Sequence, residues 1–525
     1  MTTRIPWRPS STTSVDGPRD VVIVGAGPTG LMLAAELSLA GVDVVVIERR
    51  LDQHLDGSRA GGLLPRSLEI LDQRGVVDRF LDAGHTHPAH GFAGIRMDVS
   101  DLATRHNYVL ALRQSEFEPI LADWVAGDLG VPIVRGREVA GFVQDDMGVN
   151  IELAGGEVMR SRFAVGCDGG RSVVRAATGI SFTGSEATRS WILAEVDTTT
   201  EPAKGIRWDG IGMHGANRVG EDGPVRVLLT ESILRQGEPT FDELREALIG
   251  VFGTDFGLHT VHWLSRFTDA TRQAARYRDR RVFLAGDAAH VHPPHGGQGL
   301  NTGLQDAVNL GWKLARVLQG VSPEGLLDSY QAERHPVAAR VLQNTLAQVA
   351  LTCGGDRHQA LRDTMSILLA MDQPRHHVAA MLTGLDICYD VGQGAGAHPL
   401  VGRRMPDQDL HTAHGPTRVS TLLHRGRPLL LNLIEPGAFD AATNSGRVDV
   451  VDAICDTPWD LPLLGRVPQP AGVLVRPDGH VAWAGHPADG EIAAALATWF
   501  GGPSRPGDPT PNTSSATTTS RQDST

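Results

Sequence analysis

Cysteine and lysine are scarce in this sequence, and long apolar runs are missing. Its 525 residues contain 4 cysteines, with neither a Cys-x-x-Cys pair nor the spacing of a metal-binding cluster. We therefore expect buried thiols in a reducing cytoplasm and no disulfide framework. The apolar runs have the length of a strand, as at Val44–Ile47, and fall far below the roughly 18 residues of a membrane span. These features predict a cytoplasmic protein without a membrane anchor.

The charge is unbalanced as well. A formal net charge of −13 argues against nucleic acid and anionic membrane surfaces as partners, because both repel an acidic protein. Both ends of the chain are rich in Pro, Ser and Thr. We predict a disordered leader at 1–18, which lacks the apolar segment of a signal peptide, and a disordered tail at 502–525.

The most informative segment that is present is 20–30. A run of branched apolar residues ends in Gly25, Gly27 and Gly30, spaced G-x-G-x-x-G, and a helix-like segment follows. This is the order of strand, tight turn and helix N-terminus that holds a pyrophosphate. Glu48 ends the next apolar run, where an acid can bind a ribose hydroxyl. By itself this first motif predicts a dinucleotide and leaves NAD and FAD open.

Two further clusters follow predicted strands. The second motif, Asp168-Gly169, comes directly after the strand-like segment 163–165, and alone it also fits an ordinary turn. The third motif, Gly286-Asp287, ends another apolar run, so its carboxylate can accept hydrogen bonds from sugar hydroxyls. A Pro- and Gly-rich loop then exposes backbone N–H groups, and we expect a helix to begin near Asn301 as its N-cap.

The loop after the third motif contains His290, His292 and His295, which raise the alternative of a metal site with Asp287. Two prolines stiffen this loop, and zinc ligands usually lie on regular elements or in Cys-x-x-Cys turns. We therefore interpret the histidines as hydrogen-bonding groups beside a cofactor and predict no metal.

In this order and separation, the three motifs resemble the class A flavoprotein monooxygenases, the p-hydroxybenzoate hydroxylase family. Within it they are most similar to bacterial hydroxylases of polyketides and rifamycins. The resemblance covers about residues 19–500. It implies FAD as resident cofactor, with NADPH or NADH as a visiting reductant.

The resemblance also implies the fold class, α/β (α+β). It predicts a Rossmann-like FAD-binding domain (19–182 and 275–400), an inserted mixed-sheet substrate domain (183–274) and a thioredoxin-like C-terminal domain (401–501). The inserted segment is glycine-rich and strand-dominated, and a long helical region is expected from 300 to about 352. The C-terminal domain has no Cys-x-x-Cys, so we expect no redox role for it.

Single residues acquire roles from the same resemblance. The glycines of the first motif cradle the FAD pyrophosphate, Glu48 binds the adenosine ribose, Asp168 lies near FAD and the nicotinamide, and Asp287 holds the ribityl chain. Arg59 approaches the flavin, and Gln114 touches FAD. The cofactor-binding residues implied are Gly25, Gly27, Thr29, Gly30, Glu48, Arg49, Arg59, Gln114, Asp168, Asp287, Pro293, Gly296, Gly299, Leu300 and Asn301.

The implied activity is hydroxylation of an aromatic polyketide-type substrate with O2 and NAD(P)H, through a flavin C4a-hydroperoxide, in antibiotic or other secondary-metabolite biosynthesis. Baeyer–Villiger oxygenation and rifamycin-type antibiotic inactivation stay open, and an FAD-binding protein without turnover is disfavoured. A halogenase would need a Trp-x-Trp-x-Ile motif, and an α/β-hydrolase a Gly-x-Ser-x-Gly elbow, neither of which is present.

The substrate is expected between segment 183–274 and the loop at 293–301. Candidate pocket residues are Trp191, Trp208, Met213 and His214, although core packing is the commoner role for each. No catalytic acid or base can be named from the sequence. The protein is expected to be a monomer or a homodimer.

Overall fold

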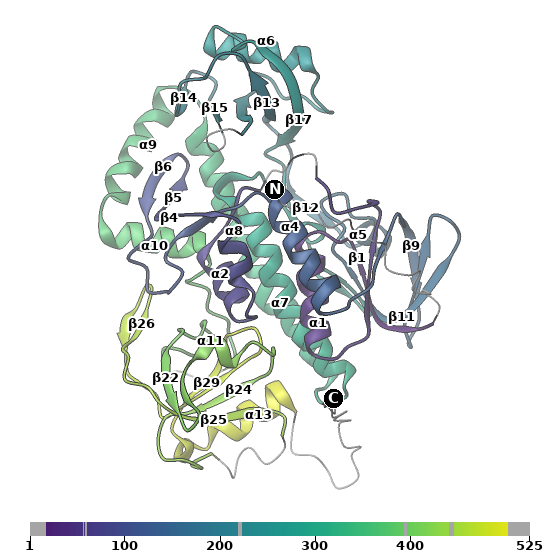
Figure 1. Ribbon diagram of the computed structural model, residues 1–525, viewed down its shortest axis with the longest axis vertical. Coiled ribbons are helices and arrows are strands. Elements are labelled where there is room, and N and C mark those ends of the chain that lie inside the picture. Colours follow the sequence, from purple (N-terminus) through teal and green to yellow (C-terminus); the bar gives the residue numbers. More distant parts are fainter. Residues whose placement is uncertain are drawn as a thin grey trace, which may run out of the picture.

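The computed structural model describes residues 17–55, 57, 60–218, 223–392, 396–439 and 446–501. The predicted tail, nearly all of the predicted leader and Arg59 lie outside the described residues. The described chain forms a mixed α/β structure in three stacked parts (Figure 1). A central part with a parallel sheet lies between an antiparallel sheet, at the top of the view, and a C-terminal unit at the bottom. None of the described helices combines the length and apolar character needed to cross a membrane.

The central sheet has the strand order β19-β20-β11-β1-β2-β8. β1 (Arg19–Val24) lies between β11 (Val158–Gly166) and β2 (Val44–Glu48), and all three run parallel. β20 (Val282–Leu284) and β8 (Ile133–Arg135) continue the parallel set on either side. Val21–Val24 of β1 and Val44–Ile47 of β2 are uninterrupted apolar runs, as expected of parallel strands that are buried on both faces.

Helices α1 (Pro28–Leu39) and α7 (Gln298–Leu318) pack closely against each other in the central part. Glycine at 311 allows this contact, because a Cβ there would lie 2.5 Å from the Cβ of Glu36. Helix α8 (Asp328–Thr352) follows α7 after a turn at 319–327. The long helical region expected from the sequence is therefore two helices, α7 and α8, that pack side by side.

The antiparallel sheet has the order β14-β15-β16-β13-β17 and its own apolar core. Helix α6 (Phe241–Phe252) contributes Leu244 and Leu248 to that core. A capping box starts the helix: the Thr240 hydroxyl accepts a hydrogen bond from the Glu243 N–H at 3.2 Å, and Glu243 accepts one from the Thr240 N–H at 3.0 Å. The strands are β13 (Ser190–Thr198), β14 (Ile206–Trp208), β15 (Met213–Arg218), β16 (Val225–Thr230) and β17 (Leu258–Thr268).

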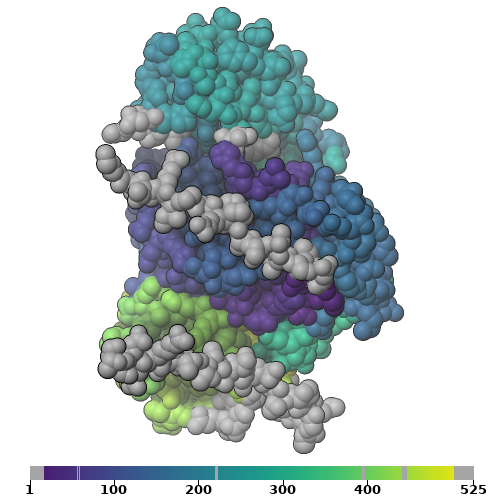
Figure 2. All heavy atoms as spheres, turned by 45° about the vertical axis from the view of Figure 1, so that its right-hand side comes forward, coloured from purple at the N-terminus to yellow at the C-terminus, as the bar shows by residue number. Residues whose placement is uncertain are grey.

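The C-terminal unit contains a mixed sheet in the order β23-β22-β25-β24-β28-β29. β24 (Leu429–Asn432) pairs in parallel with β25 (Asp449–Ile454) and antiparallel with β28 (Gly472–Val475). β28 joins β29 (Val481–Gly485) through a turn at 476–480, and helix α13 (Glu491–Phe500) packs on β29. In the space-filling view this unit presses directly against the central part (Figure 2). The thioredoxin-like comparison and the domain limits stay predictions.

Shorter elements complete the described chain. The remaining strands are β3 (Gly62–Leu63), β4 (His85–His87), β5 (Ala89–Phe92), β6 (Ile95–Asp98), β7 (Val109–Ala111), β9 (Val139–Gln144), β10 (Val149–Leu153), β12 (Phe182–Ser185), β18 (Thr271–Ala274), β19 (Arg278–Asp279), β21 (His290–Val291), β22 (Asp409–Thr412), β23 (Gly415–Arg418), β26 (Trp459–Leu461) and β27 (Gly465–Val467). The remaining helices are α2 (Pro65–Asp72), α3 (Val77–Leu81), α4 (Gln114–Asp123), α5 (Val173–Thr178), α9 (Asp356–Leu369), α10 (Asp372–Thr383) and α11 (Val419–Leu422).

Candidate functional site

The three predicted motifs lie at one edge of the central sheet. β1, β11 and β20 are adjacent and parallel, and Val24, Gly166 and Leu284 lie in one row across them. Each strand leads at its carboxyl end into one motif. The carboxyl edge of such a sheet is where α/β folds bind their ligands.

Glycines, which have no side chain, allow the three motifs to come into contact. A Cβ at Gly25, whose φ is +105°, would clash with the carbonyl oxygen of Cys167, which directly precedes the second motif. Thr29 joins the first motif to the third, since a Cβ at Gly286 would lie 2.5 Å from the Thr29 hydroxyl oxygen. A Cβ at Gly303 of α7 would clash with that same atom. The glycines therefore mark contacts between segments that are far apart in the sequence.

Gly27 has a different environment from its neighbours in the first motif. A Cβ at Gly30 would clash with the carbonyl oxygen of Gly25, whereas a Cβ at Gly27 would meet no atom within 4 Å. Gly27 is the N-cap of α1, with φ of −77°, and no side chain caps the helix. This open space at the positive end of a helix fits a pyrophosphate group.

Glu48 is held in place at the end of β2. Its Oε2 accepts a hydrogen bond from the Ala26 N–H at 2.7 Å, and its Oε1 accepts one from the Arg50 N–H at 2.9 Å. Burial alone would raise the pKa of Glu48, but these two N–H groups and the Arg50 guanidinium lower it. Glu48 is therefore ionised and oriented beside the first motif. Arg49, also predicted to bind the cofactor, is exposed directly after the strand.

Sequence reasoning missed the residues that surround Gln114 and Arg50. Gln114 Nε2 donates a hydrogen bond to Glu118 Oε2 at 3.0 Å, and Arg50 donates one to Glu118 Oε1 at 2.5 Å. Gln53 donates to the same carboxylate, which is almost fully buried. The one signal in the sequence is a glutamate among the apolar residues of the segment that forms α4.

Asp168 and Asp287 have different environments. Asp168 accepts hydrogen bonds from the Ser172 hydroxyl at 2.5 Å and from the Val174 N–H at 3.1 Å, and thereby supports the start of α5, whose N-cap is Ser172. This is the ordinary turn role that the sequence left open. Asp287 lies in a short 3-10 turn, and its side chain is exposed beside the sheet edge, where a ligand can reach it. A cofactor role for either residue stays a prediction.

The Pro- and Gly-rich loop enters α7 earlier than expected. The helix begins at Gln298 with Gly297 as its N-cap, so the prediction that Asn301 is the N-cap is wrong. Gly296 and Gly297 have φ of +73° and +62°, and this left-handed backbone ends the loop without a capping side chain. Asn301 Oδ1 instead accepts a hydrogen bond from the Leu64 N–H at 2.9 Å. Of the other predicted loop residues, Pro293 is buried and Gly299 and Leu300 are half-buried.

The loop histidines are not arranged as metal ligands, and no cluster of that kind occurs in the described ranges of the chain. The His290 ring instead bonds to Asp306 of α7, with 2.7 Å between Nε2 and Oδ2. Asp306 also accepts hydrogen bonds from the Gly286 N–H at 3.2 Å and from Arg334 Nε at 2.7 Å. Burial alone would raise the pKa of Asp306, but Arg334 and His290 lower it. The ionised carboxylate holds the third motif in place, a role that sequence reasoning missed.

A cavity of about 470 Å³ lies between the antiparallel sheet and the loop. Leu193, Leu228 and Phe267 line one side, and the Pro294–Gly296 segment and α8 line the other. Two predicted pocket residues, Met213 and His214, are among the lining residues, whereas Trp191 and Trp208 are not. Trp191 stacks on Phe267 with 5.3 Å between ring centroids, and Trp208 packs under the Arg362 guanidinium. Both tryptophans therefore have packing roles.

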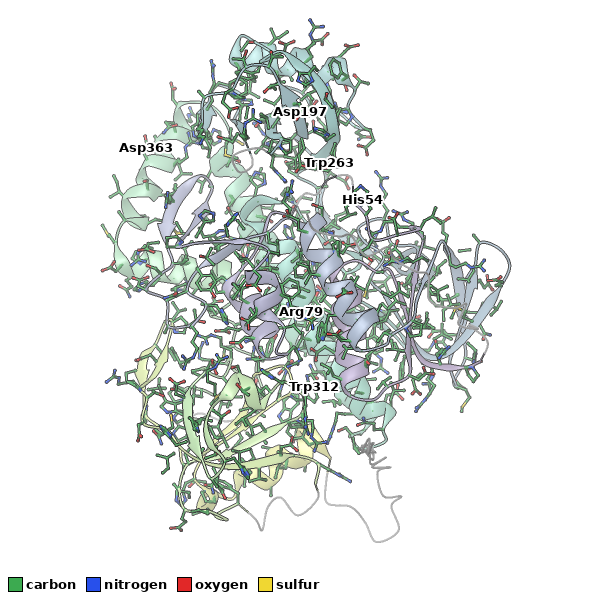
Figure 3. All side chains as sticks on the ribbon, viewed as in Figure 1. His54, Arg79, Asp197, Trp263, Trp312 and Asp363 are labelled. Carbon is green, nitrogen blue, oxygen red and sulfur yellow. The ribbon has the colours of Figure 1, made fainter. Side chains whose placement is uncertain are left out.

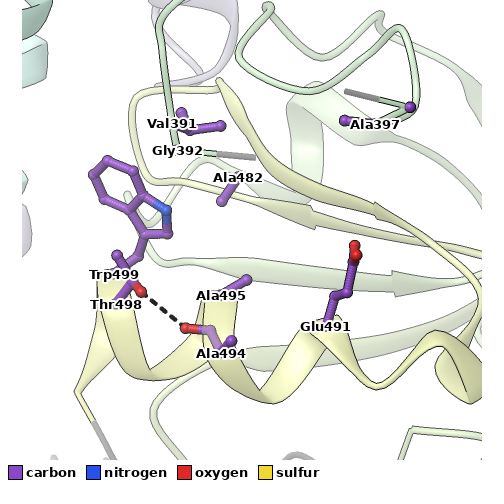
Figure 4. A pocket seen from close by; sticks show the side chains of 10 residues that line it. Val391, Gly392, Ala397, Ala482, Glu491, Ala494, Ala495, Thr498 and Trp499 are labelled. Carbon is purple, nitrogen blue, oxygen red and sulfur yellow. Dashed lines mark hydrogen bonds between the residues drawn. The ribbon is translucent and has the colours of Figure 1, made fainter. Parts of the chain in front are cut away.

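A second cavity, of about 380 Å³, lies in the C-terminal unit. Figure 4 shows Glu491, Ala495 and Trp499 of α13 along one side of it. The opposite wall includes Gly392 and Gly396, and the residues between these two are outside the described ranges. This cavity shares no lining residue with the three motifs.

The chain matches two described protein families. Residues 19–345 match the family described as FAD binding domain, and residues 398–503 match the family described as aromatic-ring hydroxylase, C-terminal. The chain belongs to the FAD-dependent aromatic-ring hydroxylases. The hydroxylase is 45% identical to a rifampicin monooxygenase of Streptomyces venezuelae, over 92% of this chain and 98% of the relative.

A relative and a solved structure named for tetracycline substrates are also similar to the hydroxylase. It is 41% identical to the 12-dehydrotetracycline 5-monooxygenase/anhydrotetracycline 6-monooxygenase of Streptomyces rimosus, over 92% of this chain and 99% of the relative. The solved structure of OxyS anhydrotetracycline hydroxylase from Streptomyces rimosus is similar with a TM-score of 0.86 and 41% identity, covering 93% of this chain and 100% of that one.

These comparisons confirm the predicted family, the FAD-dependent monooxygenase activity on aromatic compounds and the mixed α/β fold. The individual cofactor-binding residues stay predictions, and Arg59 is outside the described residues.

Proposed function

We propose that this hydroxylase converts a ring C–H of an aromatic polyketide to C–OH with one oxygen atom of O2 and reduces the other atom to water, with FAD as cofactor and NADPH or NADH as electron donor. One observation carries the proposal. The cavity of about 470 Å³ ends on Pro294–Gly296, in the loop that follows the third motif. Its volume lies within the range of sites for small organic molecules.

The residues at the sheet edge fit FAD. Gly27 leaves open space at the N-terminus of α1, Glu48 is ionised beside it, and Asp287 is exposed after the carboxyl end of β20, at the same edge of the sheet. FAD bound there would supply the redox chemistry, because amino-acid side chains cannot activate O2 by themselves. The protein's part is to orient the cofactor and substrate and to keep water away from them.

The cavity walls support this division of labour. Leu193, Leu228 and Phe267 present apolar surface that excludes water. Arg226, which pairs with Glu195 at 3.0 Å, also lines the cavity and adds a charged group to its wall. Burial, together with the nearby His292, lowers the pKa of His295 to about 4, so this ring is neutral at physiological pH. A neutral imidazole orients a substrate oxygen by hydrogen bonding and brings no extra charge to the loop.

A product analysis tests the activity. Purified protein would be supplied with NADPH or NADH, labelled O2 and a panel of anthraquinones, angucyclines, tetracyclines and rifamycins. We expect an FAD-loaded protein and a product that gains one labelled oxygen atom. The mass and connectivity of that product separate hydroxylation from Baeyer–Villiger ester formation, and turnover of a rifamycin would favour antibiotic inactivation. FAD-free protein that oxygenates no panel member would overturn the proposal.

The replacement of Gly27 by alanine tests the FAD site itself. Gly27 has an ordinary backbone conformation and open space around it, so Gly27→Ala should leave the unfolding midpoint unchanged. Its methyl group would occupy the space proposed for the pyrophosphate, and we expect FAD affinity to fall by about tenfold or more. Gly141→Ala, at another open position on β9, is the matched control and should bind FAD normally. Equal FAD affinity in both variants would contradict the assignment.

The same proposal places the protein in the cytoplasm as a monomer or homodimer, with its aromatic substrate, O2 and NAD(P)H as its only partners. Size-exclusion chromatography with light scattering would determine the oligomeric state.

A further inference from the structure

The turn between β28 and β29 is buried inside the central part of the molecule. Arg476 is 0% exposed and Asp478 is 2% exposed, although both belong to the C-terminal unit. Two arginines of the α2 region hold the turn by its backbone. Arg74 donates a hydrogen bond to the Pro477 carbonyl at 2.8 Å, and Arg66 donates one to the Asp478 carbonyl at 2.7 Å.

The side chains of this turn complete a buried charge cluster with α7 and α8, the region of Trp312 in Figure 3. Arg476 donates hydrogen bonds to Glu333 of α8 at 2.5 and 2.8 Å, and it also pairs with Asp478. Lys313 of α7 donates to the same Glu333 at 2.8 Å. We call Lys313, Glu333, Arg476 and Asp478 the turn cluster. It holds two cations and two carboxylates, so its formal charge is zero, and the loss of any one member leaves it with a net charge.

Burial alone would raise the pKa of Glu333, but Arg476 and Lys313 lower it to about 2. The carboxylate is therefore charged at physiological pH. An ionised carboxylate in a dry interior is tolerated only next to its cations, so α8 depends on the C-terminal turn for electrical balance.

The next residue of α8 reaches the flavin side of the molecule. Arg334 donates to Asp306 of α7, the carboxylate that accepts the N–H of Gly286 in the third motif. Arg334 also donates to the Tyr389 hydroxyl at 3.0 Å, and the Tyr389 ring lies 4.4 Å from that of His480 in the turn. A continuous series of buried contacts therefore joins the C-terminal turn to the Gly286-Asp287 segment.

We propose that the Arg476–His480 turn is a positioning element for the flavin site. Its charges balance those of Glu333 and Lys313 and thereby hold α7 and α8 in their relative positions. These helices in turn hold the third motif in place through Asp306 and Arg334. The C-terminal unit, which lacks a Cys-x-x-Cys, would thereby support the flavin site structurally without taking part in electron transfer. This inference rests on the proposed FAD site.

Charge balance provides the test. Arg476→Met leaves the turn cluster with one unpaired carboxylate, and Glu333→Gln leaves it with one unpaired cation. Each single change should weaken FAD binding about tenfold and alter the visible absorption spectrum of the bound flavin. The double variant Arg476→Met/Glu333→Gln retains only Lys313 and Asp478, which balance each other. We therefore expect it to bind FAD better than either single variant.

Asp449→Asn serves as the control, because Asp449 pairs with Arg427 on the exposed side of the same unit. It should retain the FAD affinity and the flavin spectrum of the unchanged protein. If Arg476→Met does not fold, Asp478→Asn, which keeps the size of the side chain, replaces it in the same measurements.

Two results would overturn the inference while leaving the proposed function intact. In the first, the unchanged protein binds FAD and Arg476→Met binds it equally well with the same spectrum, even if its unfolding midpoint falls. In the second, the losses of the two single variants add in the double variant. An unchanged protein that binds no FAD would instead refute the proposed function.

Discussion

The central part of the molecule meets its two neighbours in opposite ways (Figure 1). Toward the antiparallel sheet it leaves a cavity of about 470 Å³ with mainly apolar walls. Toward the C-terminal unit the contact is filled by arginines, with Arg74, Arg418 and Arg476 each paired to a carboxylate. The hollow contact can accept new side chains without loss of a partner. In the filled contact, the removal of one charged group leaves its partner buried without an opposite charge, so substitutions there should lower the free energy of unfolding. Substitutions in the cavity should instead lower the rate of catalysis.

The largest effect is expected from Arg74→Met. Arg74 is buried and donates hydrogen bonds to both oxygens of Glu36, at 2.6 and 2.8 Å. Its loss would leave the Glu36 carboxylate buried without a cation, which should lower the free energy of unfolding by about 3–5 kcal/mol. Arg427→Met, which removes an exposed pair with Asp449, should change it by less than about 1 kcal/mol. Urea titrations that show equal losses in both variants would refute the distinction.

An intermediate effect is expected on acidification. Burial alone would raise the pKa of Asp72, but hydrogen bonds from His106 and from Arg418, which belongs to the C-terminal unit, lower it to about 2. The corresponding pKa in an unfolded chain is 3.8. The stabilisation is therefore fully present above pH 3.8 and is lost as the pH falls toward 2. It should amount to about 1–2 kcal/mol, because solvent screens the partly exposed Arg418. In Asp72→Asn, the slope of unfolding free energy against pH should flatten in that window, and an unchanged slope would speak against the ion pair.

The smallest change in the free energy of unfolding is expected from a substitution in the cavity. Leu228→Trp would fill part of its volume from β16, and we expect kcat/KM for the identified substrate to fall about tenfold. FAD affinity and unfolding should stay as they are. Val143→Trp, on the exposed side of β9, is the control. Unimpaired turnover by Leu228→Trp would show that the substrate binds elsewhere.

The flavin side of the fold could be predicted from the sequence because its signals are local. Gly30 packs on the carbonyl oxygen of Gly25 and Gly27 leaves open space at the start of α1, an arrangement within one strand–turn–helix unit that recurs where such a unit binds a pyrophosphate. The apolar run of β1 and the position of Glu48 after β2 follow from the same unit.

The filled contact could not be predicted, because its pairs join residues that are far apart in the chain. Arg334 and Asp306 are separated by 28 positions, and Arg476 and Glu333 by 143. A charged residue within a helix also resembles a solvent-exposed one in the sequence. Lys313, one of two lysines in the chain, is nevertheless fully buried. The position of Asn301 was misjudged for a related reason, since Gly297 ends the loop through its backbone alone.

Helix α8 connects the filled contact with the cavity. Glu333 lies near its beginning, and Gln348 and Thr352 line the cavity near its end. At the rise of an α-helix these two ends lie about 28 Å apart, so a tilt of about 4° at Glu333 would move Thr352 by about 2 Å. Pro336 lies between them and interrupts the helical hydrogen bonding close to the pivot. A substitution in the C-terminal unit that tilts α8 would therefore change the shape of the cavity while every lining residue stays the same.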